Sequence, residues 1–135
     1  MNQTPLSRTL INQILHHAQS NPETEVCGLI DATDGRADQL YPINNIADEP
    51  GRLFSMDPQQ MIEAMRSMRE SGRELFAIYH SHPHAPAEPS VTDLQQAAYP
   101  DALYLIISLN TKGVLEMRGY RLGDNSVEAV ALESV

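Results

Sequence analysis

The sequence predicts an α/β protein of the α+β type, built from a curved mixed β-sheet flanked by helices. Two segments, residues 6–18 and 61–68, carry apolar residues at helical spacing. Most of the other apolar residues fall in short runs bounded by turn-forming residues, which is typical of strands. The predicted order is helix, hairpin, helix, strand, short helix and further strands. That mixture favours one sheet with helices packed against it.

The first part of the chain is predicted to form a helix and a hairpin. The helix covers residues 6–18, where apolar side chains recur every three or four positions. EVCGLIDA, residues 25–32, reads as a buried strand followed by a turn at Asp34-Gly35. The return strand is QLYPI, residues 39–43. Its Pro42 lacks a ladder donor, so we expect this strand at the edge of the sheet or Pro42 near the strand's end.

The second helix is predicted to begin at Asp57-Pro58, because aspartate suits the N-cap and proline suits the first helical position. Its predicted apolar stripe consists of Met61, Ile62, Met65 and Met68. The later elements are a strand over 74–82, a short helix over 90–98, strands over 102–109, 114–122 and 126–132, and a turn over 110–113. We expect the last strands to pair antiparallel, and residues 1–135 to form one domain.

Composition and charge narrow the function classes. Nine basic residues against eighteen acidic ones give a formal net charge of −9, which disfavours nucleic acid as a partner. Cys27 is the only cysteine, so no disulfide can form within the chain, and a reducing compartment is expected. The N-terminus lacks the pattern of a signal peptide, and no window approaches the roughly 20 apolar residues of a membrane span. We therefore predict a cytoplasmic protein without a membrane partner.

The stretch HSHPHAPAEPSVTD, residues 80–93, concentrates metal-ligand side chains in a segment with few core-forming residues. If the preceding strand continues to its start, His80 and His82 face the same side, because strand side chains alternate with period two. Two such imidazoles can bind one zinc ion at roughly 2.0–2.1 Å. Asp93, one helical turn beyond Ser90, suits the third ligand position. A catalytic zinc site keeps three protein ligands and leaves a fourth position to water.

A purely structural interpretation of the same residues stays open. Ser90-Val91-Thr92-Asp93 matches a capping box, in which the serine and the aspartate satisfy main-chain donors at the start of a helix. His80 and His82 could then be partly exposed residues at the end of a strand. The two interpretations are compatible, because a helix start can orient Asp93 toward a metal ion.

These residues resemble the signature of the JAMM (MPN+) metalloprotease family, in which H-x-H is followed by seven residues, a serine, two residues and an aspartate. The family also requires an upstream glutamate before a Cys-Gly pair, and EVCGLI supplies Glu25 there. The order of elements resembles the family over about residues 6–122. The resemblance implies the MPN/JAMM fold, a cytidine-deaminase-like arrangement, and a zinc-dependent hydrolase.

The resemblance also implies a role for each matched residue. His80, His82 and Asp93 would hold one Zn²⁺ per chain, and Glu25 would be the general base for a zinc-bound water. Ser90 would donate a hydrogen bond to the oxyanion of the tetrahedral intermediate. For Glu25 the alternative is an exposed, salt-bridged glutamate at the start of a strand.

The resemblance implies hydrolysis of an amide bond at the C-terminus of a ubiquitin-like protein. The chain lacks a long insertion after the zinc motif. This favours the compact prokaryotic members, which resemble enzymes that trim a small sulfur-carrier protein ending in Gly-Gly. An extended tail suits pairing along an edge strand, and residues 44–55 are a candidate wall of its groove. Peptide, isopeptide and modified amide bonds all stay open as the scissile bond, and so does the oligomeric state.

Two other function classes remain. One is a non-catalytic scaffold of the same fold, which the complete set of five matched residues disfavours. The other is a DNA-repair-associated JAB-like protein. Its related loop would usually carry Ser-Gly-Asp after the proline, where this chain has His-Ala-Pro, and the net charge of −9 also disfavours DNA.

Several neighbouring residues are predicted to lie outside the chemistry. Cys27 is expected to pack in the core, and Gly28 to permit a close backbone approach beside the site. His84 falls in the proline-rich loop and is expected to be exposed. His16 and His17 lie on the first helix, away from the motif, and receive no role.

Overall fold

The computed structural model describes residues 3–110, 115–123 and 126–135. The helices are α1 (Arg8–Ser20), α2 (Pro58–Glu70) and α3 (Val91–Gln96). The strands are β1 (Thr4–Leu6), β2 (Cys27–Thr33), β3 (Arg36–Ile43), β4 (Glu74–His82), β5 (Leu103–Ser108), β6 (Glu116–Gly123), β7 (Ser126–Val130) and β8 (Leu132–Ser134). The predicted turn over 110–113 lies largely outside the described residues. No helix among them is long and apolar enough to cross a membrane.

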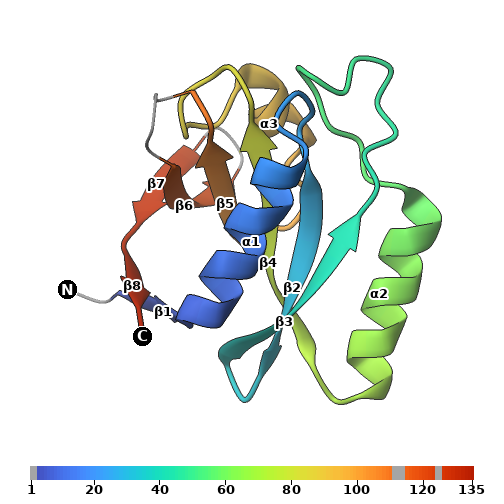
Figure 1. Cartoon of the computed structure of the whole chain (residues 1–135). Coiled ribbons are helices and arrows are strands. Elements are labelled where there is room, and N and C mark those ends of the chain that lie inside the picture. Colours follow the sequence, from blue (N-terminus) through green and yellow to red (C-terminus); the bar gives the residue numbers. More distant parts are fainter. Residues whose placement is uncertain (1–2, 111–114, 124–125) are drawn as a thin grey trace.

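A six-stranded mixed sheet of order β3-β2-β4-β5-β6-β7 organises the molecule (Figure 1). Its neighbours pair antiparallel, except that β4 and β5 run parallel and are joined through α3. Helix α1 packs on one face of the sheet and α2 on the other, each over its own cluster of buried side chains. The predicted fold class, a mixed sheet flanked by helices, is confirmed. Pro42 lies on edge strand β3, as the missing donor requires.

The two ends of the described chain depart from the prediction. Leu6 belongs to β1 and not to the first helix, because Ser7 is the N-cap and its side chain accepts from the Leu10 N–H at 3.1 Å. The last predicted strand, residues 126–132, is divided between β7 and β8. Strand β8 leaves the main sheet and pairs in parallel with β1 as a separate two-stranded sheet.

Helix α2 begins as predicted, with the Asp57 side chain accepting from two main-chain N–H groups of the first turn. Its predicted apolar stripe is wrong at Ile62, which is 59% exposed, while Ala64 and Met68 are buried. The reason is helical geometry: a residue two positions before Ala64 is rotated about 200° around the axis, onto the opposite side.

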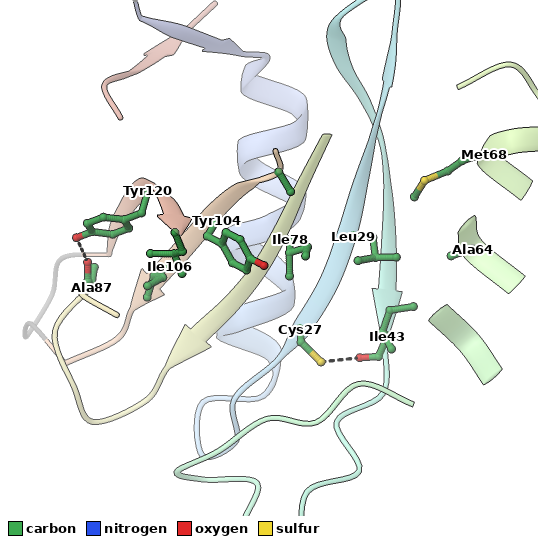
Figure 2. Packing of buried hydrophobic residues seen from close by; sticks show 12 residues of the cluster. Cys27, Leu29, Ile43, Ala64, Met68, Ile78, Ala87, Tyr104, Ile106 and Tyr120 are labelled. Atoms are coloured by element: carbon green, nitrogen blue, oxygen red, sulfur yellow. Dashed lines mark hydrogen bonds between the residues drawn. The ribbon is translucent and has the colours of Figure 1, made fainter. Parts of the chain in front are cut away.

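Cys27 and Gly28 are two small residues of strand β2, and Figure 2 shows the side chain of Cys27. Cys27 is fully buried in the cluster under α2, as predicted, and burial raises the pKa of its thiol to about 12. A Cβ added at Gly28 would overlap the ring of Tyr79. The expected close backbone approach beside the site is therefore wrong. Gly28 instead makes room for an aromatic side chain in the cluster under α1.

His17, for which no role is predicted, has a structural partner. Its Nδ1 lies 2.7 Å from the Tyr79 hydroxyl, and the two rings meet edge to face. The neighbouring His16 is exposed. This polar pair links α1 to β4 on the face of the sheet that lies opposite α2.

Candidate metal centre

Strand β4 ends in the two histidines of the candidate site. His80 and His82 project to the same side, and both side chains are buried. Their Nε2 atoms lie 3.0 Å apart. The Asp93 Oδ2 atom lies 3.1 Å from each Nε2, so the three atoms form a nearly regular triangle.

The start of α3 delivers the aspartate. Ser90 is the N-cap, and its Oγ accepts from the Asp93 N–H at 3.0 Å. In return, Asp93 Oδ2 accepts from the Ser90 N–H at 2.9 Å. The capping box predicted from the sequence is therefore present, and it uses the same carboxylate oxygen that faces the histidines. The capping interpretation is confirmed, and its geometry is compatible with Asp93 as a metal ligand.

The donor set of this triangle fits a divalent cation. His82 Nδ1 donates to the Pro86 carbonyl at 2.8 Å, so in the neutral ring the Nε2 atom carries a lone pair directed into the triangle. Lone pairs on three atoms only 3.0–3.1 Å apart repel one another unless a cation or proton lies between them. Ligands about 2.0–2.1 Å from a tetrahedral ion are themselves about 3.3 Å apart, close to the distances found here.

Glu25 completes the group. The Glu25 carboxylate and the ligand atoms of His80, His82 and Asp93 all lie within 4.8 Å of one another. The residue precedes β2 by two positions, whereas the sequence analysis placed it in that strand. Its main chain is held on both sides: its N–H donates to the Pro50 carbonyl at 2.7 Å, and its carbonyl accepts from Asn45 Nδ2 at 2.9 Å.

The electrostatics distinguish the two carboxylates. Burial raises the pKa of Glu25 to about 8; the nearby His82 opposes this shift and Asp93 adds to it. Burial also works against the Asp93 anion, but hydrogen bonds from His80 and His82 outweigh it and hold the Asp93 pKa well below its usual range. One carboxylate is therefore anionic, while the other can take up and release a proton near neutral pH.

The histidines differ in a similar way. Burial lowers the pKa of His80, which is enclosed on all sides. For His82, burial lowers the pKa as well, but hydrogen bonds to Asp93 and to the Pro86 carbonyl outweigh it, so the net shift is upward. Glu25 is 5% exposed and makes no ion pair with lysine or arginine among the described residues, which argues against an exposed, salt-bridged glutamate.

The remaining predicted residues lie at the rim. Ser90 is exposed, and in the capping box its oxygen acts as an acceptor, so the hydroxyl hydrogen is available to another partner. His84 is exposed and lies 3.6 Å from the exposed Glu23, outside the metal-ligand group, as expected.

Sequence reasoning did not single out two residues of the loop over 44–55. Asn45 binds the main chain of Glu25, and Phe54 stacks on the His80 ring with centroids 4.3 Å apart. Phe54 also lines a small, mainly apolar cavity of about 200 Å³ beside the site. The cavity is lined by Phe54, Ser55, Met56, Met61, Ile78, Gln96, Tyr99 and Tyr104. An isolated aromatic residue in a polar loop was the available signal for Phe54.

The chain is similar in sequence to known proteins. Residues 7–122 match the family of prokaryotic homologs of the JAB domain. The chain is 32% identical to the desampylase of Haloferax volcanii over 103 residues, which are 72% of this chain and 74% of that protein. It is 31% identical to the CysO-cysteine peptidase of Mycobacterium tuberculosis over 120 residues, which are 87% of this chain and 82% of that protein.

Solved structures agree with the fold. A protein from Desulfitobacterium hafniense superimposes with a TM-score of 0.87 and 31% identity, covering 98% of this chain and 93% of that one. A JAB1/MPN domain protein from Archaeoglobus fulgidus superimposes with a TM-score of 0.67 and 21% identity over the full length of both chains. The second likeness concerns the fold alone.

Proposed function

Because the chain belongs to the family of prokaryotic JAB-domain proteins, the JAMM (MPN+) metalloproteases, we propose that it is a zinc-dependent peptidase acting on ubiquitin-like proteins. It hydrolyses an amide bond at the C-terminus of a ubiquitin-like or sulfur-carrier protein that ends in Gly-Gly. The observation that carries this proposal is the convergence of two buried histidines, an anionic aspartate and a protonatable glutamate within 4.8 Å.

His80, His82 and Asp93 hold one Zn²⁺ per chain in this proposal. Nitrogen and carboxylate ligands are those that zinc prefers in catalytic sites with three protein ligands. When bound, the ion supplies a Lewis acid that polarises the scissile carbonyl and activates water. The capping box fixes Asp93 from one side, and the Pro86 carbonyl fixes the ring of His82 from the other.

Glu25 moves the proton. Its carboxylate takes a proton from the attacking water and gives it to the departing amine. Burial favours the protonated form of this group, so the second transfer starts from a carboxylic acid that is stable near neutral pH. The hydrogen bonds to Pro50 and Asn45 fix the main chain from which the carboxylate projects.

Ser90 stabilises the developing oxyanion. Its hydroxyl hydrogen is not needed for the capping box, where the oxygen is the acceptor. The serine can therefore cap α3 and donate to substrate at the same time. In other hydrolases one such donor is worth about 2.7–4 kcal/mol of transition-state stabilisation.

The substrate class follows from the relatives and from the groove. Two relatives of this chain are named for a desampylase activity and for a CysO-cysteine substrate. Residues 44–55 form one wall beside the metal-ligand group, where Phe54 contacts His80. A Gly-Gly end presents no side chains to the metal-ligand group, and the apolar cavity of about 200 Å³ suits an apolar side chain further up the tail.

The alternatives are less well supported. A non-catalytic scaffold has no need of the buried, pre-oriented group of four. A DNA-repair-associated JAB-like protein would have to bring a chain of net charge −9 onto a phosphate backbone. We also propose that residues 1–135 form one domain, and we favour a cytoplasmic location because the single cysteine is a free, buried thiol.

Incubation with model carriers tests the function. Zinc-loaded protein is mixed with small ubiquitin-like carriers ending in Gly-Gly-X, and mass spectrometry follows the loss of X. We expect X to be removed from Gly-Gly-X and not from a matched carrier ending in Ala-Ala-X, and the Glu25→Gln variant to be nearly inactive on both. Equal turnover of the two carriers would contradict the proposed substrate class, and no turnover of any carrier would contradict the proposed reaction.

A further inference from the structure

The loop between β4 and α3 turns three consecutive carbonyl groups toward three neighbouring strands. Each carbonyl accepts a hydrogen bond from one side chain of a different strand. The bonds are Ser108 Oγ of β5 to the Ala85 carbonyl at 2.7 Å, His82 Nδ1 of β4 to the Pro86 carbonyl at 2.8 Å, and the Tyr120 hydroxyl of β6 to the Ala87 carbonyl at 2.6 Å. Figure 2 shows the last of these bonds.

The three donors are fixed parts of the sheet. Ser108, His82 and Tyr120 are all buried, at 0%, 3% and 6% exposure. The loop itself has few ways to hold its shape, because three of the seven residues in PHAPAEP, 83–89, are prolines without an N–H. The loop is held by the buried residues Pro83 and Ala87, by a bond from the Glu88 N–H to the Pro86 carbonyl at 2.8 Å, and by the three carbonyl groups for which the strands provide donors.

The middle carbonyl is the one that matters for the metal-ligand group. The Pro86 carbonyl sets the tautomer of His82 and orients its ring, which leaves Nε2 free to face Asp93. The loop then reaches Ser90, whose capping box holds Asp93 in the triangle. The same seven residues thus connect two of the three proposed ligands.

We propose that Tyr120 and Ser108 are positioning residues for the metal centre. Neither hydroxyl forms a hydrogen bond with a proposed ligand, although the main chain of Ser108 lies beside that of His82 in the sheet. By holding the carbonyls of Ala85 and Ala87, they fix the Pro86 carbonyl between them and the path of the chain into Ser90. This inference rests on the proposed metal site, but it does not depend on which substrate the protein cleaves.

The test removes one hydroxyl and keeps the ring. Tyr120→Phe should bind Zn²⁺ up to about 10-fold more weakly than the unchanged protein in a competition with a chelator, the lower end of the effect of losing a direct outer partner of a metal ligand. Ser108→Ala should weaken zinc binding in the same direction. It tests the neighbouring carbonyl independently if the tyrosine variant does not fold.

Tyr79→Phe is the matched control. It also removes a buried tyrosine hydroxyl with a short hydrogen bond, 2.7 Å to His17, but in the cluster under α1. We expect its zinc affinity to equal that of the unchanged protein even though its melting temperature falls. Equal losses of zinc affinity in Tyr79→Phe and Tyr120→Phe would overturn the inference, because both would then reflect general destabilisation.

A second measurement needs no metal. The Asp93 N–H donates to Ser90 Oγ in the capping box. The hydrogen-exchange rate of this amide therefore reports whether the capping box at the start of α3 is formed. In zinc-free protein, Tyr120→Phe should exchange this amide at least several-fold faster, and Tyr79→Phe should not. Unchanged protection in Tyr120→Phe and Ser108→Ala, together with unchanged zinc affinity, would show that the two hydroxyls only pack. None of these measurements involves hydrolysis. Their outcome is therefore independent of the outcome of the carrier assay.

Discussion

The side-chain amide of Asn45 holds the main chain of Glu25, with Nδ2 2.9 Å from the Glu25 carbonyl oxygen. The same Nδ2 donates to the Leu53 carbonyl at 2.9 Å, and Oδ1 accepts from the N–H groups of Ala47 and Ser55 at 3.0 Å each. One side chain therefore anchors both the glutamate and the loop over residues 44–55.

Replacing this amide by an isosteric carboxylate should impair the proposed general base, Glu25, without affecting zinc binding. Asn45→Asp keeps the acceptor oxygen but replaces the NH₂ donor, which binds two carbonyl groups, with a second acceptor oxygen. The loss of these bonds should lower stability by about 1–3 kcal/mol. We expect kcat/KM to fall about 100-fold through misplacement of Glu25, with zinc content unchanged. Asn44→Asp, at the exposed neighbouring position, should change neither quantity. Parallel loss of zinc and activity would argue against a specific effect on Glu25.

The protein should bind about one zinc ion per chain. His82→Ala should lose most of it, because two protein ligands hold the ion poorly. His84→Ala removes an exposed histidine outside the metal-ligand group and should retain about one zinc ion per chain. Elemental analysis measures both, and equal zinc in the His82 variant and the unchanged protein would rule out the proposed ligand set.

Ser90→Ala should affect both stability and rate. Loss of the cap should reduce the free energy of unfolding by about 0.5–2 kcal/mol. Loss of the oxyanion donor should lower the catalytic rate about 100-fold or more while zinc stays bound. Ser90→Thr keeps both the cap and the hydroxyl and serves as the control. A lower melting temperature with an unchanged rate would leave Ser90 as a cap alone.

Glu25→Gln should strongly lower turnover without loss of the bound zinc. Glutamine keeps the shape of the side chain but cannot accept the proton, so hydrolysis should fall by about 100- to 10,000-fold. Zinc content and affinity for the carrier tail should stay at their original levels. Glu23→Gln, at an exposed position two residues earlier, should be fully active. Loss of zinc from Glu25→Gln would make Glu25 a ligand, and full activity would remove it from the mechanism.

Stability should depend on pH through His17. Burial, and secondly the charge of His16, lowers the pKa of His17 in the folded state, so the fold favours the neutral imidazole. This contribution is complete above the ordinary pKa of 6.5 and is lost as the pH falls through the lowered value. Denaturant unfolding between pH 8 and pH 5 should therefore show a smaller loss of stability in His17→Gln than in the unchanged protein. His16→Gln should keep most of the pH dependence, because burial is the larger of the two causes that lower the pKa of His17.

The sequence predicted those parts of the molecule that are encoded locally. The helix start at Asp57 and the alternation that brings His80 and His82 to one face depend only on neighbouring residues. Leu6 was assigned to a helix because its spacing fits one, but its burial comes from strand pairing with a segment more than a hundred positions later.

Three of the residues that were not predicted from the sequence share one physical property. Asn45, Ser108 and Tyr120 each bind main-chain carbonyl groups, and a carbonyl acceptor is present at every residue. The identity of the residue that provides the carbonyl group therefore gives no sign in the sequence that it accepts such a hydrogen bond. His17 was set aside for a related reason, since its partner, Tyr79, lies 62 positions away.

The proposed ligands and the proposed base come from very different distances along the chain. His80 and Asp93 are 13 positions apart, whereas the bond from the Val26 N–H to Ser81 Oγ, which docks the Glu25 segment beside the histidines, spans 55 positions. Two doublings of loop length cost about 1.2 kcal/mol of closure entropy. The loop between His80 and Asp93 is therefore favoured to close before the loop that brings Val26 to Ser81. Chains that already carry the ion but have not yet docked their base would then be intermediates on the way to the enzyme. The metal content of a refolding sample is therefore expected to rise ahead of its activity.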